Sequence, residues 1–291
     1  MSVREIDPGS SARAVLGLHA ETAFFGVDIG SRQSKCCLIN DGRWFLGLVP
    51  SGVDSQETAQ DLLALSLKCA GISAGRVAWA VGTGYGRITL NFGTIPSETI
   101  TEISCHGMGA HILQPHARTI VDIGGQDCKA LRVDPADGSV VEFAMNDRCA
   151  AGTGRFLERT AEMLGIEVEE LGNLSLGSKK KIDISSQCVV FAESEIVTLK
   201  ARGESPADIA AGVHMATARR VKNLVGRIGF EPELVFSGGV SNNKGMRVAL
   251  ETLFETPIRP LPVDPVFCGA LGAAALAARS HGQAQEVRAA R

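Results

Sequence analysis

The sequence lacks any apolar run long enough to cross a membrane. Its longest run of small apolar residues, 270–278, is interrupted by Gly272 and is far shorter than the ~20 residues that span a bilayer. It also lacks an excess of positive charge, since 29 Lys and Arg residues face 32 Asp and Glu residues, for a formal net charge of -3. Aromatic residues make up only 5% of the chain and offer few surfaces on which bases stack. We therefore expect no membrane partner and no nucleic-acid partner.

The eight cysteines form no C-x-x-C pair and no dense framework of the kind found in small secreted domains. Residues 1–22 place acids beside arginines and contain only a brief apolar stretch, 14–18, so they lack the plan of a secretory signal. The sequence therefore predicts a cytoplasmic protein. Its cysteines are expected to be free thiols, metal ligands or core residues.

Length and composition predict a folded α/β protein of two lobes. At 291 residues the chain exceeds the usual size of one domain, and its 45% hydrophobic residues suffice for a large core. Short β-branched runs alternate with segments of helical period, and this order restarts near residue 118. The last residues, 279–291, carry no periodic apolar face and are expected to fray. The expected divisions are a flexible N-terminal leader (1–22), a first lobe (23–115), a second lobe that contains Cys149 and Cys188 (116–267) and a C-terminal helix and tail (268–291).

Glycine turns follow three of the expected strands, and the first two turns begin alike, 94 positions apart. The turns are Asp28–Ser31, Asp122–Asp127 and Ser237–Val240. Glycine lets the backbone approach a phosphate closely, and an aspartate can hold Mg²⁺ or its water. Ser31, Ser34 and Lys35 add hydroxyl and ammonium donors beside the first turn. A single turn of this kind is usually structural, but three in this order predict a phosphate clamp with two sides.

Two cysteines stand before expected helices. Cys149 lies in the segment N-D-R-C-A-A-G-T-G-R-F-L, and Cys188 follows a polar turn and precedes F-A-E-S-E. The N-terminus of a helix stabilises negative charge and so favours a thiolate or an anionic metal–sulfur cluster. The alternative is that both are buried thiols. The other six cysteines are expected to be core residues.

An iron–sulfur cluster commonly has four thiolate ligands, whereas only two cysteines of this chain stand in such turns. A two-fold axis repeats every contact. Cys149 and Cys188 from each of two chains would therefore complete one shared 4Fe-4S cluster.

The motifs together resemble the BadF/BadG/BcrA/BcrD-type ATPase family, which includes activators of 2-hydroxyacyl-CoA dehydratases and ATPase subunits of benzoyl-CoA reductase. The resemblance runs from about residue 23 to 279. Its most specific segments are D-I-G-S at Asp28, G-T-G-Y-G-R at Gly82, E-I-S-C-H at Glu102, D-I-G-G-Q-D at Asp122, and the two cysteine segments.

The resemblance implies an actin-like, sugar-kinase-like ATPase fold built from two duplicated ribonuclease H-like lobes. It implies ATP, Mg²⁺ and one 4Fe-4S cluster per dimer as cofactors, with Cys149 and Cys188 as cluster ligands. Asp28 and Asp122 become the carboxylates on the magnesium side, and Gln126, Asp127 or Glu102 positions the attacking water. The implied nucleotide-binding residues are Gly30, Ser31, Ser34, Lys35, Gly124, Gly125, Gly238, Gly239 and Val240.

The function that this resemblance implies is ATP-gated donation of one electron at low potential. The implied partners are a second copy or a homologous ATPase subunit, a catalytic reductase or dehydratase component, and a ferredoxin or flavodoxin as electron donor. Chain length and the leader slightly favour a benzoyl-CoA reductase, while the motifs suit a dehydratase activator equally well.

Two other functions share these features. A small-molecule kinase of the same superfold has the same glycine turns but needs a substrate pocket and no metal cluster. A sensor or scaffold switched by nucleotide needs neither cysteine. Bound iron distinguishes the electron donor from both.

Overall fold

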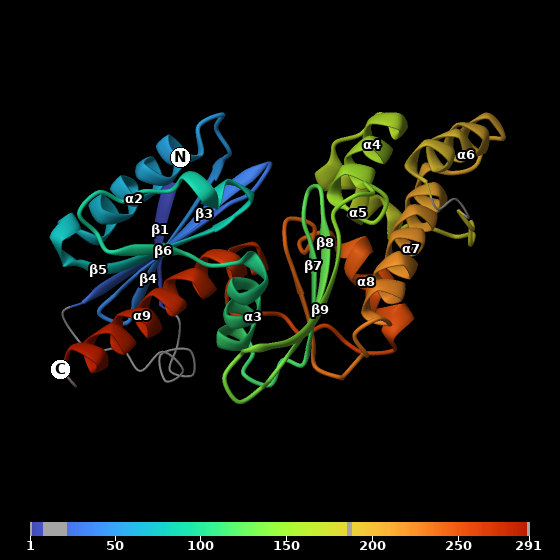
Figure 1. The fold of residues 1–291 in the computed structure, drawn as a ribbon. Helices are drawn as coiled ribbons and strands as arrows, with labels where there is room; N and C mark the ends of the chain where they lie inside the picture. Colours follow the sequence, from blue (N-terminus) through green and yellow to red (C-terminus); the bar gives the residue numbers. More distant parts are fainter. Residues whose placement is uncertain (1, 8–21, 185–187, 290–291) are drawn as a thin grey trace. The chain divides into compact units, whose positions relative to one another are not determined.

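The computed structural model describes residues 2–7, 22–184 and 188–289, and the chain divides into two compact units (Figure 1). Unit 1 comprises 1–116, 134–140 and 261–291, and unit 2 comprises 117–133 and 141–260. The expected second lobe, 116–267, therefore includes the stretches 134–140 and 261–267, which belong to unit 1 in the structure. The reason is visible at its end, where Val263, Val266 and Phe267 are buried in a core with Trp44 and Leu46 of unit 1.

Unit 1 is built on a six-stranded sheet in the order β1-β4-β3-β2-β5-β6. The strands are β1 (Ser2–Ile6), β2 (Ala23–Ile29), β3 (Gln33–Asn40), β4 (Arg43–Pro50), β5 (Val77–Gly84) and β6 (Ser97–Thr99). Strands β2, β3 and β4 form an antiparallel meander, and β5 runs parallel to β2. The helices are α2 (Ser55–Ala70), α3 (Glu102–Leu113) and α9 (Cys268–Ala289), with short 3-10 helices at Ala74–Arg76, Tyr85–Thr89 and Pro265–Phe267.

The sheet of unit 1 is apolar on both faces because helices cover both (Figure 1). Phe25 and Val27 of β2 pack with Leu62 of α2 on one face. On the other face Phe24 packs with Ala273 of α9. Burial on both faces explains why β2 reads as a continuous apolar run rather than as an alternation.

Helix α9 approaches its neighbours at backbone distance. A Cβ at Gly26 of β2 would lie 2.2 Å from the amide nitrogen of Ala274, and one at Gly109 of α3 would lie 1.9 Å from the carbonyl oxygen of Cys268. The helix continues to Ala289, so the expected frayed tail at 279–291 is helical through residue 289. Contacts from elsewhere in unit 1 hold it there: Arg279 donates to the carbonyl oxygen of Asp137, and His281 packs beside Phe24.

One further expectation for unit 1 differs from the structure. Within the expected flexible leader, β1 pairs antiparallel with β4, while residues 8–21 lie outside the described residues. Strand β6 pairs parallel with β5 and precedes α3, which starts at Glu102.

Unit 2 repeats the central arrangement of unit 1 in a four-stranded sheet of order β10-β7-β8-β9. Its strands are β7 (Thr119–Ile123), β8 (Cys128–Val133), β9 (Val140–Asn146) and β10 (Leu234–Ser237). Strands β7 and β8 are antiparallel, and β10 runs parallel to β7 as β5 runs parallel to β2. The helices are α4 (Gly154–Leu164), α5 (Val168–Ser175), α6 (Val189–Ala201), α7 (Pro206–Val225) and α8 (Lys244–Phe254).

The core of unit 2 lies between its sheet and its helices (Figure 1). Val121 of β7 and Phe236 of β10 pack there with Phe156 of α4, Val213 of α7 and Leu250 of α8. Among the described residues of both units, no helix combines the length and the apolar character needed to cross a bilayer.

Candidate functional site

The carboxylate of Asp28 lies at the end of β2 and is enclosed by unit 1. The residue is 4% exposed. Lys35 faces it across the β2–β3 pair, with its Nζ 3.4 Å from Asp28 Oδ2. This ammonium supplies the opposite charge that a buried carboxylate requires.

Glycines allow the backbone to crowd this carboxylate. Gly84, at the end of β5, has a φ of +87°, and a Cβ there would lie 2.5 Å from Asp28 Oδ1 and 2.5 Å from the carbonyl oxygen of Ile29. A Cβ at Gly269, in the first turn of α9, would lie 2.8 Å from Asp28 Oδ2. No side chain fits at either position without displacing Asp28.

The turn after β2 separates the three donors expected there. Ser31 is exposed, whereas Ser34 is fully buried and shares a 2.8 Å hydrogen bond with Ser51. Ser51 in turn donates to the carbonyl oxygen of Gly30. Ser34 therefore supports the turn from within. The sequence led us to expect its hydroxyl at the surface of the turn, but the hydroxyl is buried.

Unit 2 contains a second carboxylate turn of the same construction. Asp122 is 2% exposed at the corresponding position of β7, and Lys129 faces it across the β7–β8 pair at 3.4 Å. Lys129 also contacts Asp127 Oδ2 at 2.6 Å, and Ser237 donates to Asp122 Oδ1 at 2.9 Å. Gly238 has a φ of +87°, the same value as Gly84.

The third glycine turn is attached to the second. A Cβ at Gly238 would lie 2.4 Å from the carbonyl oxygen of Ile123, and the amide of Val240 donates to that same oxygen. The space around Gly239 is open, with no atom within 4 Å of where its Cβ would lie. In the second turn, Gln126 is exposed, whereas Asp127 forms an ion pair with Lys129.

Neither Lys129 nor Gly84 was assigned a role from the sequence, although the repeat contains a signal for the lysine. Lys35 follows Asp28 by seven positions, and Lys129 follows Asp122 by the same interval. The 94-residue offset therefore identifies both lysines, because residues that oppose each other across two equivalent strand pairs recur at equal spacing.

Cys149 lies in the loop that joins β9 to α4. Asn146 Nδ2 donates to the carbonyl oxygens of Cys149, at 2.9 Å, and of Ala151, at 3.4 Å. The Cys149 thiol is half-buried, and Nη1 of Arg220 on α7 lies 3.9 Å from its sulfur. Helix α4 begins five residues after Cys149, so this cysteine stands in the preceding loop rather than at the cap.

The start of α4 is hydrogen-bonded to the second carboxylate turn. The amide of Gly154 donates to the carbonyl oxygen of Gly124 at 2.8 Å, and the amide of Arg155 donates to that of Gly125 at 2.9 Å. The Cys149 loop, the first turn of α4 and the second carboxylate turn thus form one connected piece of unit 2.

Cys188 is the N-cap residue of α6 and is exposed. Two apolar side chains of the first helical turn, Val190 and Phe191, are 65% and 69% exposed. Residues 185–187, which precede Cys188 in the motif, lie outside the described residues.

The other cysteines differ from these two, and most are core residues as expected. Cys36, Cys37, Cys105, Cys128 and Cys268 are buried. Burial raises the pKa of the Cys36 thiol to about 11 and that of Cys105 to about 12, which disfavours the thiolate needed to bind a metal. Cys69 departs from the expectation because it is exposed, with its thiol 3.5 Å from the carbonyl oxygen of Val3.

These thiols fit an iron–sulfur cluster only as half of its ligand set. Among the described residues, no three His, Cys, Asp or Glu side chains gather as a metal site, and Cys149 and Cys188 would be two of the four thiolates that such a cluster commonly has. Cys149 and Cys188 are the accessible thiols at a helix start or the loop before it. Arg220 Nη2 is buried and finds no hydrogen-bond partner among the described residues, which suits an anionic group beside Cys149.

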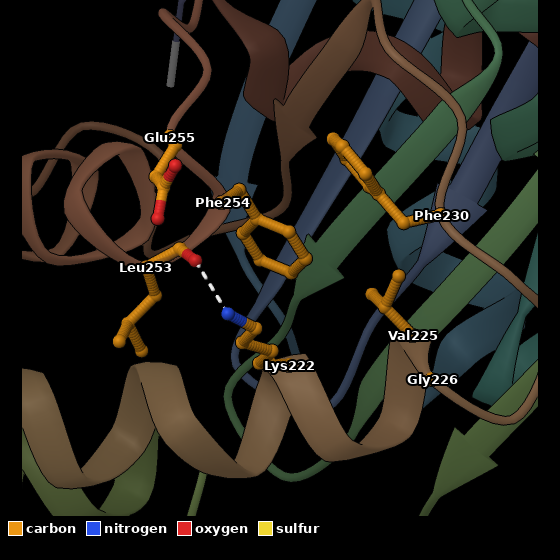
Figure 2. A pocket seen from close by; sticks show the side chains of 7 residues that line it. All are labelled: Lys222, Val225, Gly226, Phe230, Leu253, Phe254 and Glu255. Carbon is orange, nitrogen blue, oxygen red and sulfur yellow. Dashed lines mark hydrogen bonds between the residues drawn. The ribbon is translucent and has the colours of Figure 1, made fainter.

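Unit 2 also contains a small apolar pocket of about 230 Å³ that includes none of the expected site residues (Figure 2). Phe230 and Phe254 line it with ring centroids 4.9 Å apart, and Lys222 Nζ donates to the carbonyl oxygen of Leu253 at 2.7 Å. Its lysine is thus already engaged, and we assign no ligand to this pocket.

Comparison with known proteins identifies relatives over nearly the whole chain. The sequence model of the BadF/BadG/BcrA/BcrD ATPase family matches residues 25–277. An (R)-2-hydroxyglutaryl-CoA dehydratase activating ATPase from Acidaminococcus fermentans is 40% identical over 251 residues, which cover 86% of this chain and 94% of the relative. One of the subunits of benzoyl-CoA reductase from Thauera aromatica is 34% identical over 267 residues, 88% of this chain and 93% of the relative.

A solved structure agrees with the sequence relatives. The activator of the 2-hydroxyisocaproyl-CoA dehydratase from Clostridium difficile, with bound ADPNP, superimposes with a TM-score of 0.81 at 38% identity and covers 91% of this chain and 97% of that chain. The expected actin-like ATPase fold is confirmed.

Proposed function

Because this chain belongs to the BadF/BadG/BcrA/BcrD ATPase family, we propose that it is an ATP-dependent activator of an acyl-CoA dehydratase or reductase. It couples hydrolysis of MgATP to ADP and phosphate with transfer of one electron to the catalytic component of that enzyme. A ferredoxin or flavodoxin supplies a new electron to the activator after each transfer. The greater identity to a dehydratase activator than to a benzoyl-CoA reductase component favours a dehydratase partner, against the slight preference that chain length and leader suggest.

The observation that carries this proposal is the connection within unit 2 between the second carboxylate turn and the Cys149 loop. Two backbone hydrogen bonds from α4, to Gly124 and Gly125, join the turn to the helix that follows the loop. A change at the turn when nucleotide binds is therefore transmitted to the cysteine through a rigid element and not through a flexible linker.

The nucleotide role rests on the two carboxylate turns. Asp28 and Asp122 act on the magnesium side, where carboxylates and phosphate oxygens are the ligands that Mg²⁺ prefers. Lys35 and the glycine turns Gly30, Gly124, Gly125, Gly238 and Gly239 favour binding of the negatively charged phosphates, while Lys129 supports the second turn from within. Ser31 and Val240 border these turns, Ser34 supports the first of them, and Gln126 or Asp127 orients the attacking water.

The redox role rests on Cys149 and Cys188. We propose that two chains share one 4Fe-4S cluster through these four thiolates, and when bound the cluster supplies a one-electron donor of low potential. The exposed apolar start of α6, beside Cys188, is the surface we assign to the second copy, because large exposed apolar side chains at one place mark an interface. A homologous ATPase subunit with the same surface would serve equally.

The kinase and the sensor are the competing functions. The relatives are named as ATPase activators of dehydratases, which supports the electron donor and not the kinase. A nucleotide-switched sensor would tolerate loss of both cysteines, whereas an activator would not.

Iron analysis tests the cluster. Anaerobically purified protein should contain about four irons per dimer, and Cys149→Ala or Cys188→Ala should lose them. Cys69→Ala is the matched control, since Cys69 is also exposed and should keep the iron. A Cys149→Ala/Cys188→Ala double variant with full iron content would refute the ligand assignment.

Rapid-mixing absorbance tests the coupling. Reduced protein with MgATP should pass one electron to the purified catalytic component, and reduced protein without nucleotide should not. Transfer at the same rate without nucleotide would leave a simple ferredoxin-like donor and would eliminate ATP gating.

A further inference from the structure

The guanidinium group of Arg220, on α7, contacts the Cys149 sulfur through one of its two terminal nitrogens. Its Nη1 lies 3.9 Å from Sγ, while its Nη2 is buried and has no hydrogen-bond partner among the described residues. A guanidinium is always charged, and one that is partly buried, as that of Arg220 is, is commonly paired with a carboxylate. Among the described residues, the side-chain contact of the Arg220 guanidinium is instead with the thiol of Cys149, 71 positions away in the chain.

The surroundings of Arg220 do not neutralise its charge. It lines a pocket of about 410 Å³ in unit 2, together with Arg219 and Arg227, and the described lining residues include no Asp or Glu. The charge of Arg219 is compensated by an ion pair with Asp183. Arg227 is exposed to solvent, which screens its charge. Of the three arginines that line this pocket, Arg220 is the one that contacts the Cys149 sulfur.

We propose that Arg220 sets the reduction potential of the cluster assigned above to Cys149, by holding a positive charge against a ligand sulfur. The inference rests on the proposed function. Reduction by one electron adds one negative charge to a cluster that its thiolates already make anionic, so a fixed cation nearby favours the reduced form and raises the potential. Arg220 thereby keeps the cluster within reach of the electron donor.

The same contact has a consequence for the outgoing electron. Arg220 lies on α7 and Cys149 on the loop before α4, so the two belong to different elements of unit 2. A movement that separates them lowers the potential and makes the electron more reducing.

An anaerobic redox titration of the dimer, followed by electron paramagnetic resonance, tests this role. At the ambient potential where the wild-type cluster is half reduced, Arg220→Gln should lower the ratio of reduced to oxidised cluster about tenfold, which corresponds to about 59 mV for one electron. Arg220→Lys, which keeps the charge, should change the ratio less than Arg220→Gln does. Arg227→Gln, in the same pocket but exposed, should change it less than twofold.

The outcomes separate this inference from the proposed function. A normal iron content in Arg220→Gln with an unchanged potential would overturn the role of Arg220 and leave the electron-donor function intact. Loss of iron from both variants would overturn the inference by making Arg220 a residue needed for assembly. Wild-type protein that binds no iron would overturn the proposed function and this inference together.

Discussion

Lys129 holds the second carboxylate turn together from within. Its side chain is 2% exposed and contacts both Asp122 and Asp127. Removing one partner of a buried ion pair costs far more than the pair contributes, because the remaining charge stays buried and unpaired. Lys35 occupies the equivalent position in the first turn. It is more exposed than Lys129, and among the described carboxylates it pairs with Asp28.

The paired lysines predict unequal effects on stability. Lys129→Met should lower the free energy of unfolding of unit 2 by about 3 to 5 kcal/mol, and Lys35→Met should cost unit 1 less than half as much. Urea unfolding followed by circular dichroism measures the first loss. Fluorescence of Trp44 and Trp79 reports unit 1, where both tryptophans lie. Equal losses in the two variants would contradict this account, and adding Asp122→Asn should partly restore Lys129→Met.

His214 of α7 makes stability depend on pH. It is 1% exposed, and neither ring nitrogen has a hydrogen-bond partner among the described residues. Burial lowers its pKa from 6.5 to about 4. The unfolded chain therefore binds a proton between these values that the folded chain does not, and stability falls as the pH drops from about 6.5 toward 4.

We expect the wild-type protein to lose about 2 kcal/mol of stability through His214 between pH 7 and pH 5. His214→Leu should remove that part of the pH dependence, as measured by urea unfolding at both pH values. His116→Gln, a change at an exposed histidine, should leave the dependence unchanged. If the free energy of unfolding changes equally with pH in the wild type and in His214→Leu, the buried histidine is not the source of the pH dependence.

At the scale of elements, the first turn of α4 is where the nucleotide and cysteine segments meet. A Cβ at Gly154 would lie 3.1 Å from the carbonyl oxygen of Gly124 and 3.2 Å from Val240 Cγ2. A larger side chain must therefore push α4 away from the turn, while the exposed side chain of Arg155 makes no such demand.

In Gly154→Val, binding of nucleotide should no longer change the conformation of the Cys149 loop. In cluster-free protein, MgATP should change the rate at which an alkylating reagent modifies Cys149 several-fold in the wild type, and by less than twofold in Gly154→Val. Arg155→Ala, which keeps the backbone hydrogen bonds, should respond like the wild type. A full response in Gly154→Val would show that the signal takes another route.

Much of this arrangement could be predicted from the sequence where local pattern decides the structure. The strands around Asp28 and Asp122 were predicted because apolar runs end there in glycine turns. The helical end of α9 was not, because Arg279 and His281 are held by residues far away in the chain. Of the site residues, Lys129 was recoverable from the repeat, whereas nothing in the sequence connects Arg220 with Cys149.

At the scale of the whole molecule, the proposed dimer would link assembly to iron binding through the exposed start of α6. The proposed shared cluster and an apolar contact beside it would stabilise the same dimer, so loss of either would weaken the other by mass action. Phe191→Asp places a charge on this surface without removing a thiol.

We expect Phe191→Asp to yield monomers that hold less than half of the wild-type iron, measured by sedimentation and iron analysis of the same sample. Val248→Asp, on the exposed face of α8, should remain dimeric with full iron content. A dimer that survives Phe191→Asp with its iron would place the second copy elsewhere.

The late position of α9 in the chain determines the order in which the units are completed during synthesis. Unit 2 has all of its residues once position 260 is made, while β2 and α3 wait for the helix that closes against Gly26 and Gly109. A chain that ends at residue 262 should therefore resist protease over unit 2 and be digested over residues 22–116; protection of both would contradict this order. Domains commonly fold from the N-terminus onward as the ribosome delivers them, but here we expect the part that is made first to fold last.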